Sequence, residues 1–132
     1  MLQLNFSVGT PTSEQRRDAL ALLKQEFIGL FTGKQTPLKW MGTRTQLFEM
    51  IYLVYVEDMI LTDDGRPLSL TALASLTCLR FGERLTANPC AYIYKSRARK
   101  GTRSRTFFDS YCLYFCEGLA EPLRKFYLRI AA

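Results

Sequence analysis

A helix that is apolar on nearly all of its sides is the feature that most restricts how this chain can fold. Thr43 and Gln46 have the spacing of a capping box, in which two side chains satisfy free backbone N–H groups at a helix start. The predicted helix runs to about Met59, and its apolar residues are not confined to one stripe: Leu47, Phe48, Met50, Ile51, Leu53, Val54 and Val56. Because so little polar face is left for water, this helix is predicted to lie in the centre of the domain.

Two amphipathic helices are predicted to pack around the central one. The first begins at a capping box of Thr12 and Gln15 and ends near Phe31, before Gly33, with one apolar face: Leu20, Leu23, Phe27, Leu30 and Phe31. The second is capped by Ser69 and runs through residue 81, with leucines at near-helical spacing: Leu70, Leu73, Leu76 and Leu79. An Asp-Asp-Gly turn at residues 63–65 separates this second helix from the central one.

Three more helical segments are predicted in the last third of the chain. Asn88 and Pro89 form an N-cap and first-turn pair, which predicts a helix over residues 89–100 that ends at Gly101. Ser104 is expected to cap the next helix, whose inward residues are Phe107, Phe108, Tyr111, Cys112 and Phe115. Pro122 then restarts a C-terminal helix with an apolar set of its own: Leu123, Phe126, Tyr127 and Ile130.

Two short strands complete the predicted fold. Residues 2–8 alternate apolar and polar side chains, and Leu38 and Trp40 indicate a shorter strand. A strand cannot stand alone, so residues 2–8 must pair within the domain or with a second copy of the chain, and a homodimer is one expectation. The chain has 132 residues, 48% of them hydrophobic, which suffices for one domain with a real core. The expected fold class is a single domain, mainly α with a few short strands.

The residue inventory argues against an enzyme and against a metal protein. The chain has no histidine, which excludes Ser–His and Cys–His nucleophile pairs and histidine metal sites. The four cysteines lack a C-x-x-C pair and stand among apolar residues, so they are expected to be reduced core thiols: Cys78, Cys90, Cys112 and Cys116. The longest apolar run, residues 50–56, is far short of the ~20 residues that a membrane span needs, and no secretory signal is evident. We therefore expect a cytoplasmic, non-enzymatic protein with no cofactor and no membrane contact.

The positive charge of the chain is confined to one segment. Residues 95–105, called the basic segment below, read K-S-R-A-R-K-G-T-R-S-R and contain six cations and no acid. The whole chain has 18 Lys and Arg against 12 Asp and Glu, so the remainder is electrically balanced. A neutral body with one basic segment is typical of a protein that meets a polyanion, and double-stranded DNA is the expected partner.

The arrangement of helices favours DNA as that polyanion. The predicted helices over residues 69–81 and 89–100 have the layout of a helix-turn-helix, although their connection is longer than the ~3–4-residue turn of that motif. Arg44 joins the candidate contacts because a cation in the first turn of a helix is unfavourable to the helix dipole, so another group is expected to hold it. The full set of expected nucleic-acid contacts is Lys95, Arg97, Arg99, Lys100, Arg103, Ser104, Arg105, Thr106 and Arg44.

Other readings of the basic segment remain open at this point. The segment can dock an acidic partner protein, which would make the chain a non-enzymatic protein-interaction module. It can also be a solvated helix end whose cations favour the C-terminal dipole. RNA is a weaker candidate, because the sequence lacks the interleaved stacking aromatics of RNA-recognition sheets.

Two stretches resemble motifs of the RteC family, regulators found with conjugative transposons. Residues 40–52 read W-M-G-T-R-T-Q-L-F-E-M-I-Y and are similar to that family's W-x-G-[ST]-[KR]-T-x-L-x-E-L-I-Y block. Arg99-Lys100 followed by residues 104–110 resembles its R-K-x-S-R-T-x-F-L-D segment, with two extra residues before Ser104. The likeness covers about residues 38–112, and the part before Trp40 is far shorter than the family's N-terminal domain.

The resemblance implies a winged-helix-like DNA-binding domain in a transcriptional regulator of mobile-element excision or transfer. It divides the single domain into an N-terminal strand and helix (1–36), an RteC-like core (37–112) and a C-terminal helix (113–132). Family function would fall on the basic segment and the helix before it. Trp40, Gly42 and Thr43 are expected to have structural roles as a core anchor, a turn and a helix cap.

Overall fold

The computed structural model describes residues 10–32, 36–57, 60–85 and 106–130. The described elements follow the chain in this order: α1 (Ser13–Gly29), β1 (Leu38–Trp40), α2 (Arg44–Val56), α3 (Leu70–Arg80), α5 (Phe107–Cys116), the 3-10 helix η2 (Pro122–Phe126) and β2 (Tyr127–Arg129). The fold is mainly helical with a small two-stranded sheet, which confirms the expected mainly α class with a few short strands. The predicted strand at residues 2–8 and the predicted helix at residues 89–100 lie outside the described residues.

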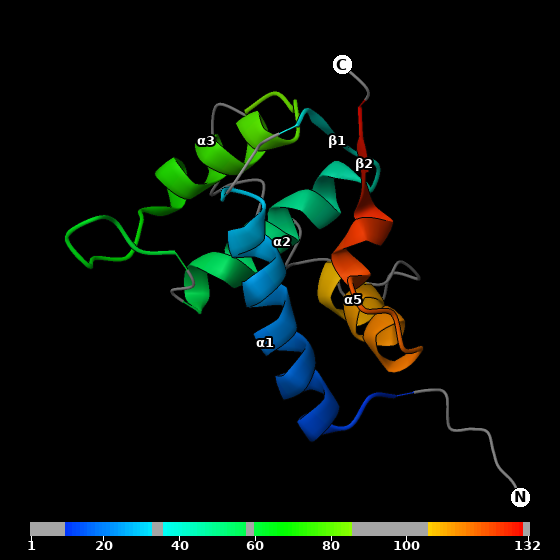
Figure 1. Cartoon of the computed structure of the whole chain (residues 1–132). Coiled ribbons are helices and arrows are strands. Elements are labelled where there is room, and N and C mark those ends of the chain that lie inside the picture. The colour runs from blue at the N-terminus through cyan, green and yellow to red at the C-terminus, as the bar shows by residue number, and fades with distance from the viewer. Residues whose placement is uncertain (1–9, 33–35, 58–59, 86–105, 131–132) are drawn as a thin grey trace, which may run out of the picture.

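Helix α2 lies in the centre of the molecule, as its composition predicts. It packs against α3 on one side and α5 on another, and α1 crosses in front of it (Figure 1). Five of its apolar side chains are fully buried: Leu47, Phe48, Met50, Ile51 and Val54. The prediction is weaker toward the C-terminal end, where Leu53 is only partly buried and Val56 is 49% exposed.

The helix starts agree with the capping patterns in the sequence. Both capping boxes form, with the side chains of Thr12 and Thr43 accepting from the backbone N–H groups of Gln15 and Gln46. Ser69 caps α3 in the same way. At its other end α1 stops at Gly29, slightly earlier than predicted.

The apolar face of α3 differs from the predicted leucine row. Leu73 is buried, but Leu76 and Leu79 are 44% and 78% exposed. A spacing of three residues falls short of the 3.6-residue helical turn, so successive leucines wind around the helix instead of sharing one side. The buried face follows true helical spacing and consists of Leu73, Ala74, Thr77 and Cys78.

The C-terminal segment is a strand where the sequence analysis predicted a helix. Helix α5 ends at Cys116, Gly118 turns the chain at a φ of +92°, and Pro122 begins the 3-10 helix. The chain then extends into β2, which pairs antiparallel with β1 and places Tyr127 opposite Trp40. The expected C-terminal helix over residues 113–132 is therefore wrong, because pairing with a strand almost 90 residues away overrides the local apolar spacing.

An aromatic cluster around Trp40 joins the sheet to the helices. The Trp40 ring stacks on Phe126 at 5.7 Å and meets Phe81 edge-on at 5.1 Å, between ring centroids. Phe107 at the start of α5 lies 4.8 Å from Phe126 in the same cluster. Trp40 is thus a core anchor, as expected, and it fixes β1 beside the N-terminal end of α2.

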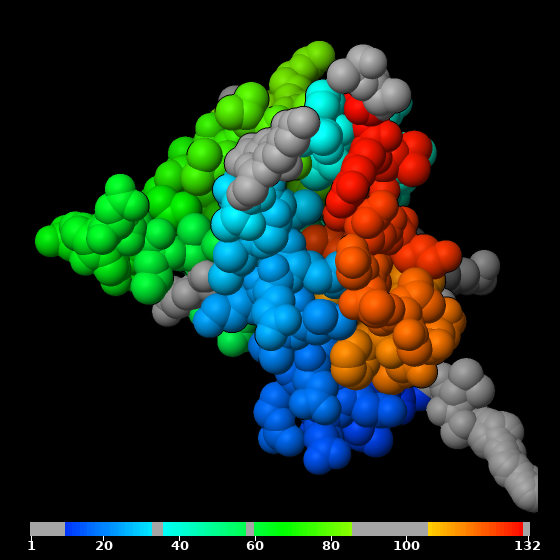
Figure 2. All heavy atoms as spheres, in the orientation of Figure 1, coloured from blue at the N-terminus to red at the C-terminus, as the bar shows by residue number. Residues whose placement is uncertain are grey.

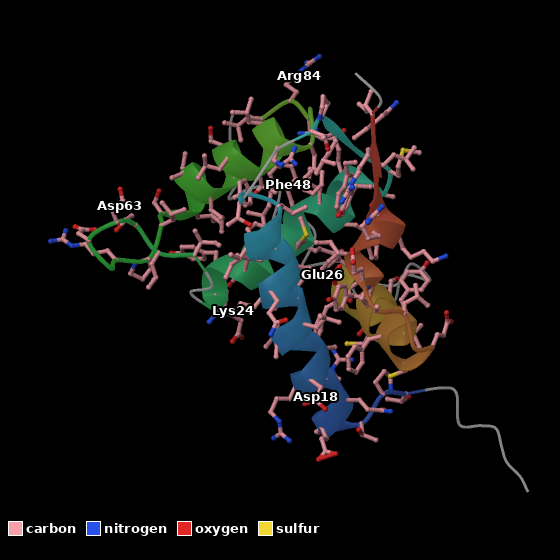
Figure 3. The ribbon with its side chains drawn as sticks, in the orientation of Figure 1. Asp18, Lys24, Glu26, Phe48, Asp63 and Arg84 are labelled. Atoms are coloured by element: carbon pink, nitrogen blue, oxygen red, sulfur yellow. The ribbon has the colours of Figure 1, made fainter. Side chains whose placement is uncertain are left out.

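The predicted turn before α3 is confirmed and forms a projection from the body. Leu61 bridges to Pro67, and Gly65 has a φ of +84°, a conformation that suits glycine. Figure 2 shows this segment standing away from the packed helices, with Asp63 near its tip in Figure 3.

Candidate nucleic-acid interface

Most of the predicted nucleic-acid contacts fall outside the part of the chain that the structure describes. These are Lys95, Arg97, Arg99, Lys100, Arg103, Ser104 and Arg105. Arg44 and Thr106 are described, and so are the two points at which the chain enters and leaves residues 86–105. The structure therefore describes the base of the candidate interface, which consists of the residues on either side of 86–105 and the side chains that hold them.

Arg44 holds the entry point of that stretch. One terminal nitrogen of its guanidinium donates to the Glu83 carboxylate at 3.1 Å, and the other donates to the backbone carbonyl of Arg84 at 2.8 Å. The guanidinium also lies over the Phe48 ring, 5.4 Å from its centroid. The sequence analysis expected some group to hold a cation at this unfavourable helix position, and Glu83 and the Arg84 carbonyl do so. A phosphate contact by Arg44 stays a prediction.

Glu49 holds the exit point. Its carboxylate accepts a 3.0 Å hydrogen bond from the backbone N–H of Phe107, the first residue of α5. Glu49 is five residues after Arg44 on α2, so the two anchoring side chains are separated by about 7.5 Å along the helix axis. Arg84 and Phe107, on either side of residues 86–105, are consequently fixed to the same half of one buried helix.

Thr106 has a structural role that the sequence analysis assigned to Ser104. Its hydroxyl oxygen accepts from the backbone N–H of Asp109 at 3.1 Å and so caps α5. A threonine hydroxyl that accepts in this way keeps its proton for donation, and Thr106 is exposed. A contact between that hydroxyl and a phosphate oxygen is compatible with the cap.

Arg84 is a candidate that the sequence analysis missed. Its backbone is fixed by Arg44, and its exposed side chain projects outward from the end of α3 (Figure 3). Among the described residues its guanidinium makes no ion pair. A count of charge along the chain hides this cation, because Glu83 beside it cancels its charge, whereas in the structure Glu83 is occupied by Arg44.

The thiols do not form a metal site in the described part of the chain. No group of three metal-binding side chains is found there. Cys78 and Cys112 are buried as expected, and burial raises the pKa of the Cys112 thiol to about 11. Cys116 is exposed, so its assignment to the core is wrong: it occupies the last turn of α5, beyond the packed surface. Cys90 lies outside the described residues.

A half-buried carboxyl group on α1 was also missed. Glu26 accepts hydrogen bonds from the Tyr111 hydroxyl at 2.5 Å and from the backbone N–H of Leu123 at 3.3 Å. Burial raises the pKa of Glu26, and these two hydrogen bonds only partly oppose the shift. Glutamate on an amphipathic helix normally faces water, and the sequence has no signal that Tyr111, 85 residues later, supplies a partner.

Comparison of the chain with family models, curated proteins and solved structures gives no match. The helices within the described ranges include none that is long and apolar enough to cross a bilayer.

Proposed function

We propose that this chain is a non-enzymatic DNA-binding transcriptional regulator whose basic segment contacts double-stranded DNA. The observation that carries the proposal is the confinement of charge: six cations and no acid in residues 95–105, on a body with equal numbers of basic and acidic residues. The resemblance to RteC regulators suggests a winged-helix-like domain that controls genes for mobile-element excision or transfer. Neither the family nor the winged helix is required for the DNA contact itself.

The anchors on α2 support this proposal physically. A charged segment that must be ordered on binding loses affinity to conformational entropy, and fixing its two ends reduces that loss. Arg44 fixes one end through Arg84, and Glu49 fixes the other through Phe107. Because α2 is the central helix, the base of the segment is attached to the core of the domain.

The proposed contacts divide by chemistry. Arginines suit bidentate contacts with guanine, which makes Arg97, Arg99 and Arg103 the candidates for base readout. Phosphate oxygens are expected to be met by the remaining cations and hydroxyls: Lys95, Lys100, Ser104, Arg105 and Thr106. Arg84 adds a cation beside the entry point.

A salt series on duplex DNA tests the proposal. If five or six cations each displace a counterion, log K against log salt should have a slope of about −4.5 to −5.5. Replacing Lys95, Lys100 and Arg105 by glutamine should make the slope shallower by about 3. Replacing Arg17, Lys24 and Arg66, which lie on α1 and on the turn before α3, removes the same charge elsewhere and should leave the slope nearly unchanged.

Sequence preference is tested by selecting bound duplexes from a random pool. A recovered consensus is expected for a regulator, and a palindromic one would indicate a homodimer. A steep salt slope without any consensus would reduce the function to non-specific binding. Failure to bind duplex even at low salt would overturn the proposal in favour of the protein-interaction module, whose partner would carry an acidic surface.

A further inference from the structure

A pocket of about 570 Å³ lies between α1 and the β1–β2 sheet. Its walls come from α1, the end of α3, the residues before η2, and the two strands. This volume is within the range of small-molecule sites, about 300–1,000 Å³. The pocket combines an apolar floor, which includes Leu38 and buried Tyr127, with charged groups of both signs.

One end of the pocket is basic. Arg80 is held there by hydrogen bonds from its guanidinium to the carbonyl oxygens of Leu30 at 2.6 Å and Thr36 at 2.8 Å. Arg129 also lines the pocket, and it pairs across the sheet with Leu38, two residues after Thr36. Neither guanidinium forms an ion pair with an acid among the described residues, so the pocket lining contains two positive charges without a described counter-charge.

The other end of the pocket is acidic. Glu26 projects from α1 toward η2, where both of its hydrogen bonds to described residues are accepted by the same carboxylate oxygen, Oε1 (Figure 3). Glu121, just before η2, lines the pocket beside it and pairs with Arg124 at 3.4 Å at an exposed position. The elevated pKa of Glu26 indicates that burial destabilises its charged form more than the hydrogen bonds to it stabilise that form.

The acidic residue and the backbone carbonyl that holds Arg80 are about one helical turn apart along the chain. Glu26 precedes Leu30 by four residues on α1, a rise of about 6 Å, and Leu30 is the residue whose carbonyl holds Arg80. Because an acidic and a basic group line the same pocket, the pocket matches a molecule that carries both a carboxylate and an ammonium group.

We propose that this pocket binds a small zwitterion of the ω-amino-acid or dipeptide class, with its carboxylate at Arg80 and Arg129 and its ammonium at Glu26. Charge-assisted hydrogen bonds at both ends fix the orientation of the ligand. The apolar floor around Leu38 and Tyr127 covers the methylene or peptide chain between them. The proposal is independent of DNA binding.

Calorimetric titration of the full chain with a length series tests the pocket. The probes are glycine, 6-aminohexanoate and glycylglycine, with hexanoate and hexylamine as single-charge controls. We expect 6-aminohexanoate or glycylglycine to bind at least about tenfold more tightly than either single-charge compound. Equal binding of 6-aminohexanoate, hexanoate and hexylamine, or no saturation by either longer zwitterion at millimolar concentration, would overturn the proposal.

Two variants and a matched control locate the binding. Arg129→Gln removes an exposed pocket cation, and Glu26→Gln removes the acidic group; each should weaken the better zwitterion about tenfold. Lys39→Gln removes a cation from the same sheet, one residue after the pocket residue Leu38, and should leave binding unchanged. Thermal melts identify any variant that fails to fold. In that case Arg129→Lys is a second test, because it keeps the positive charge but lacks the planar guanidinium group. Wild-type affinity in both Arg129→Gln and Glu26→Gln would place the ligand elsewhere.

Discussion

The guanidinium of Arg44 donates a 3.1 Å hydrogen bond to the carboxylate of Glu83, which joins the first turn of the central helix to the chain just beyond α3. Both side chains are about one-third exposed or less, so solvent screens the pair only partly. A double-mutant cycle with Arg44→Ala and Glu83→Gln should give a coupling free energy of about 1 kcal/mol in urea unfolding. Additive effects of the two substitutions would show that the pair contributes nothing.

Substitution of the same arginine tests whether it only positions the residues that bind DNA or also contacts DNA itself. If Arg44 only holds the base of residues 86–105, Arg44→Ala should lower duplex affinity while the salt slope stays constant. If it also contacts a phosphate, the slope should become shallower by about 1. Measuring affinity at several salt concentrations for this one variant distinguishes the two roles.

Gly42 is predicted to resist substitution because of its surroundings. A Cβ at this position would lie 2.7 Å from the Gln46 side-chain oxygen and 3.1 Å from the Trp40 indole nitrogen. That glutamine oxygen accepts the Thr43 N–H in the capping box, so Gly42→Ala should cost about 1 kcal/mol of unfolding free energy.

Gly29 provides the matched control for that substitution. It ends α1, and a Cβ there meets nothing within 4 Å. Gly29→Ala should therefore be neutral or stabilise the chain by up to about 1 kcal/mol. Equal destabilisation by the two substitutions in urea titrations would contradict the steric explanation at Gly42.

Local patterns in the sequence predicted the fold well where the structure depends on neighbours in the chain. The caps at Thr12, Thr43 and Ser69 and the central position of α2 follow from spacing and composition alone. The wrong predictions occur where a residue or strand far away in the sequence determines the local structure. β2 forms because β1 offers an edge, and the sequence of residues 122–130 carries the same apolar spacing as a helix turn. Likewise, helix-dipole reasoning indicated that Arg44 needed a partner, but nothing local identified Glu83.

Thiol reactivity should follow burial along α5. In a Cys90→Ser background, exposed Cys116 should be alkylated rapidly near neutral pH, while Cys78 and Cys112 should be protected. Burial raises the pKa of Cys112 to about 11, so almost none of its thiolate is available for reaction. Mass spectrometry of iodoacetamide-treated protein measures the alkylation of each cysteine, and Cys116→Ser serves as the control. Modification of Cys112 as fast as Cys116 in the folded chain would be inconsistent with the packing of α5.

Glu26 should make the stability of the chain fall as pH rises. Burial raises its pKa above the ordinary value of 4.5, so the folded chain binds this proton more tightly than the unfolded chain. The stabilisation that protonation provides is fully present below the ordinary pKa and is lost as pH rises through the elevated folded value. Glu26→Gln keeps an acceptor for Tyr111 and Leu123 but cannot ionise.

The stability of the natural chain relative to Glu26→Gln should therefore decrease with increasing pH. The measurement is urea unfolding of both proteins from below pH 4.5 to neutrality. Glu14→Gln removes the same charge from α1 at a position where the side chain is 77% exposed, and it serves as the matched control. A relative stability that rises with pH would mean that the hydrogen bonds from Tyr111 and Leu123 outweigh burial. The carboxylate would then already be compensated, and the case for an ammonium ligand at the acidic end of the pocket would weaken with it.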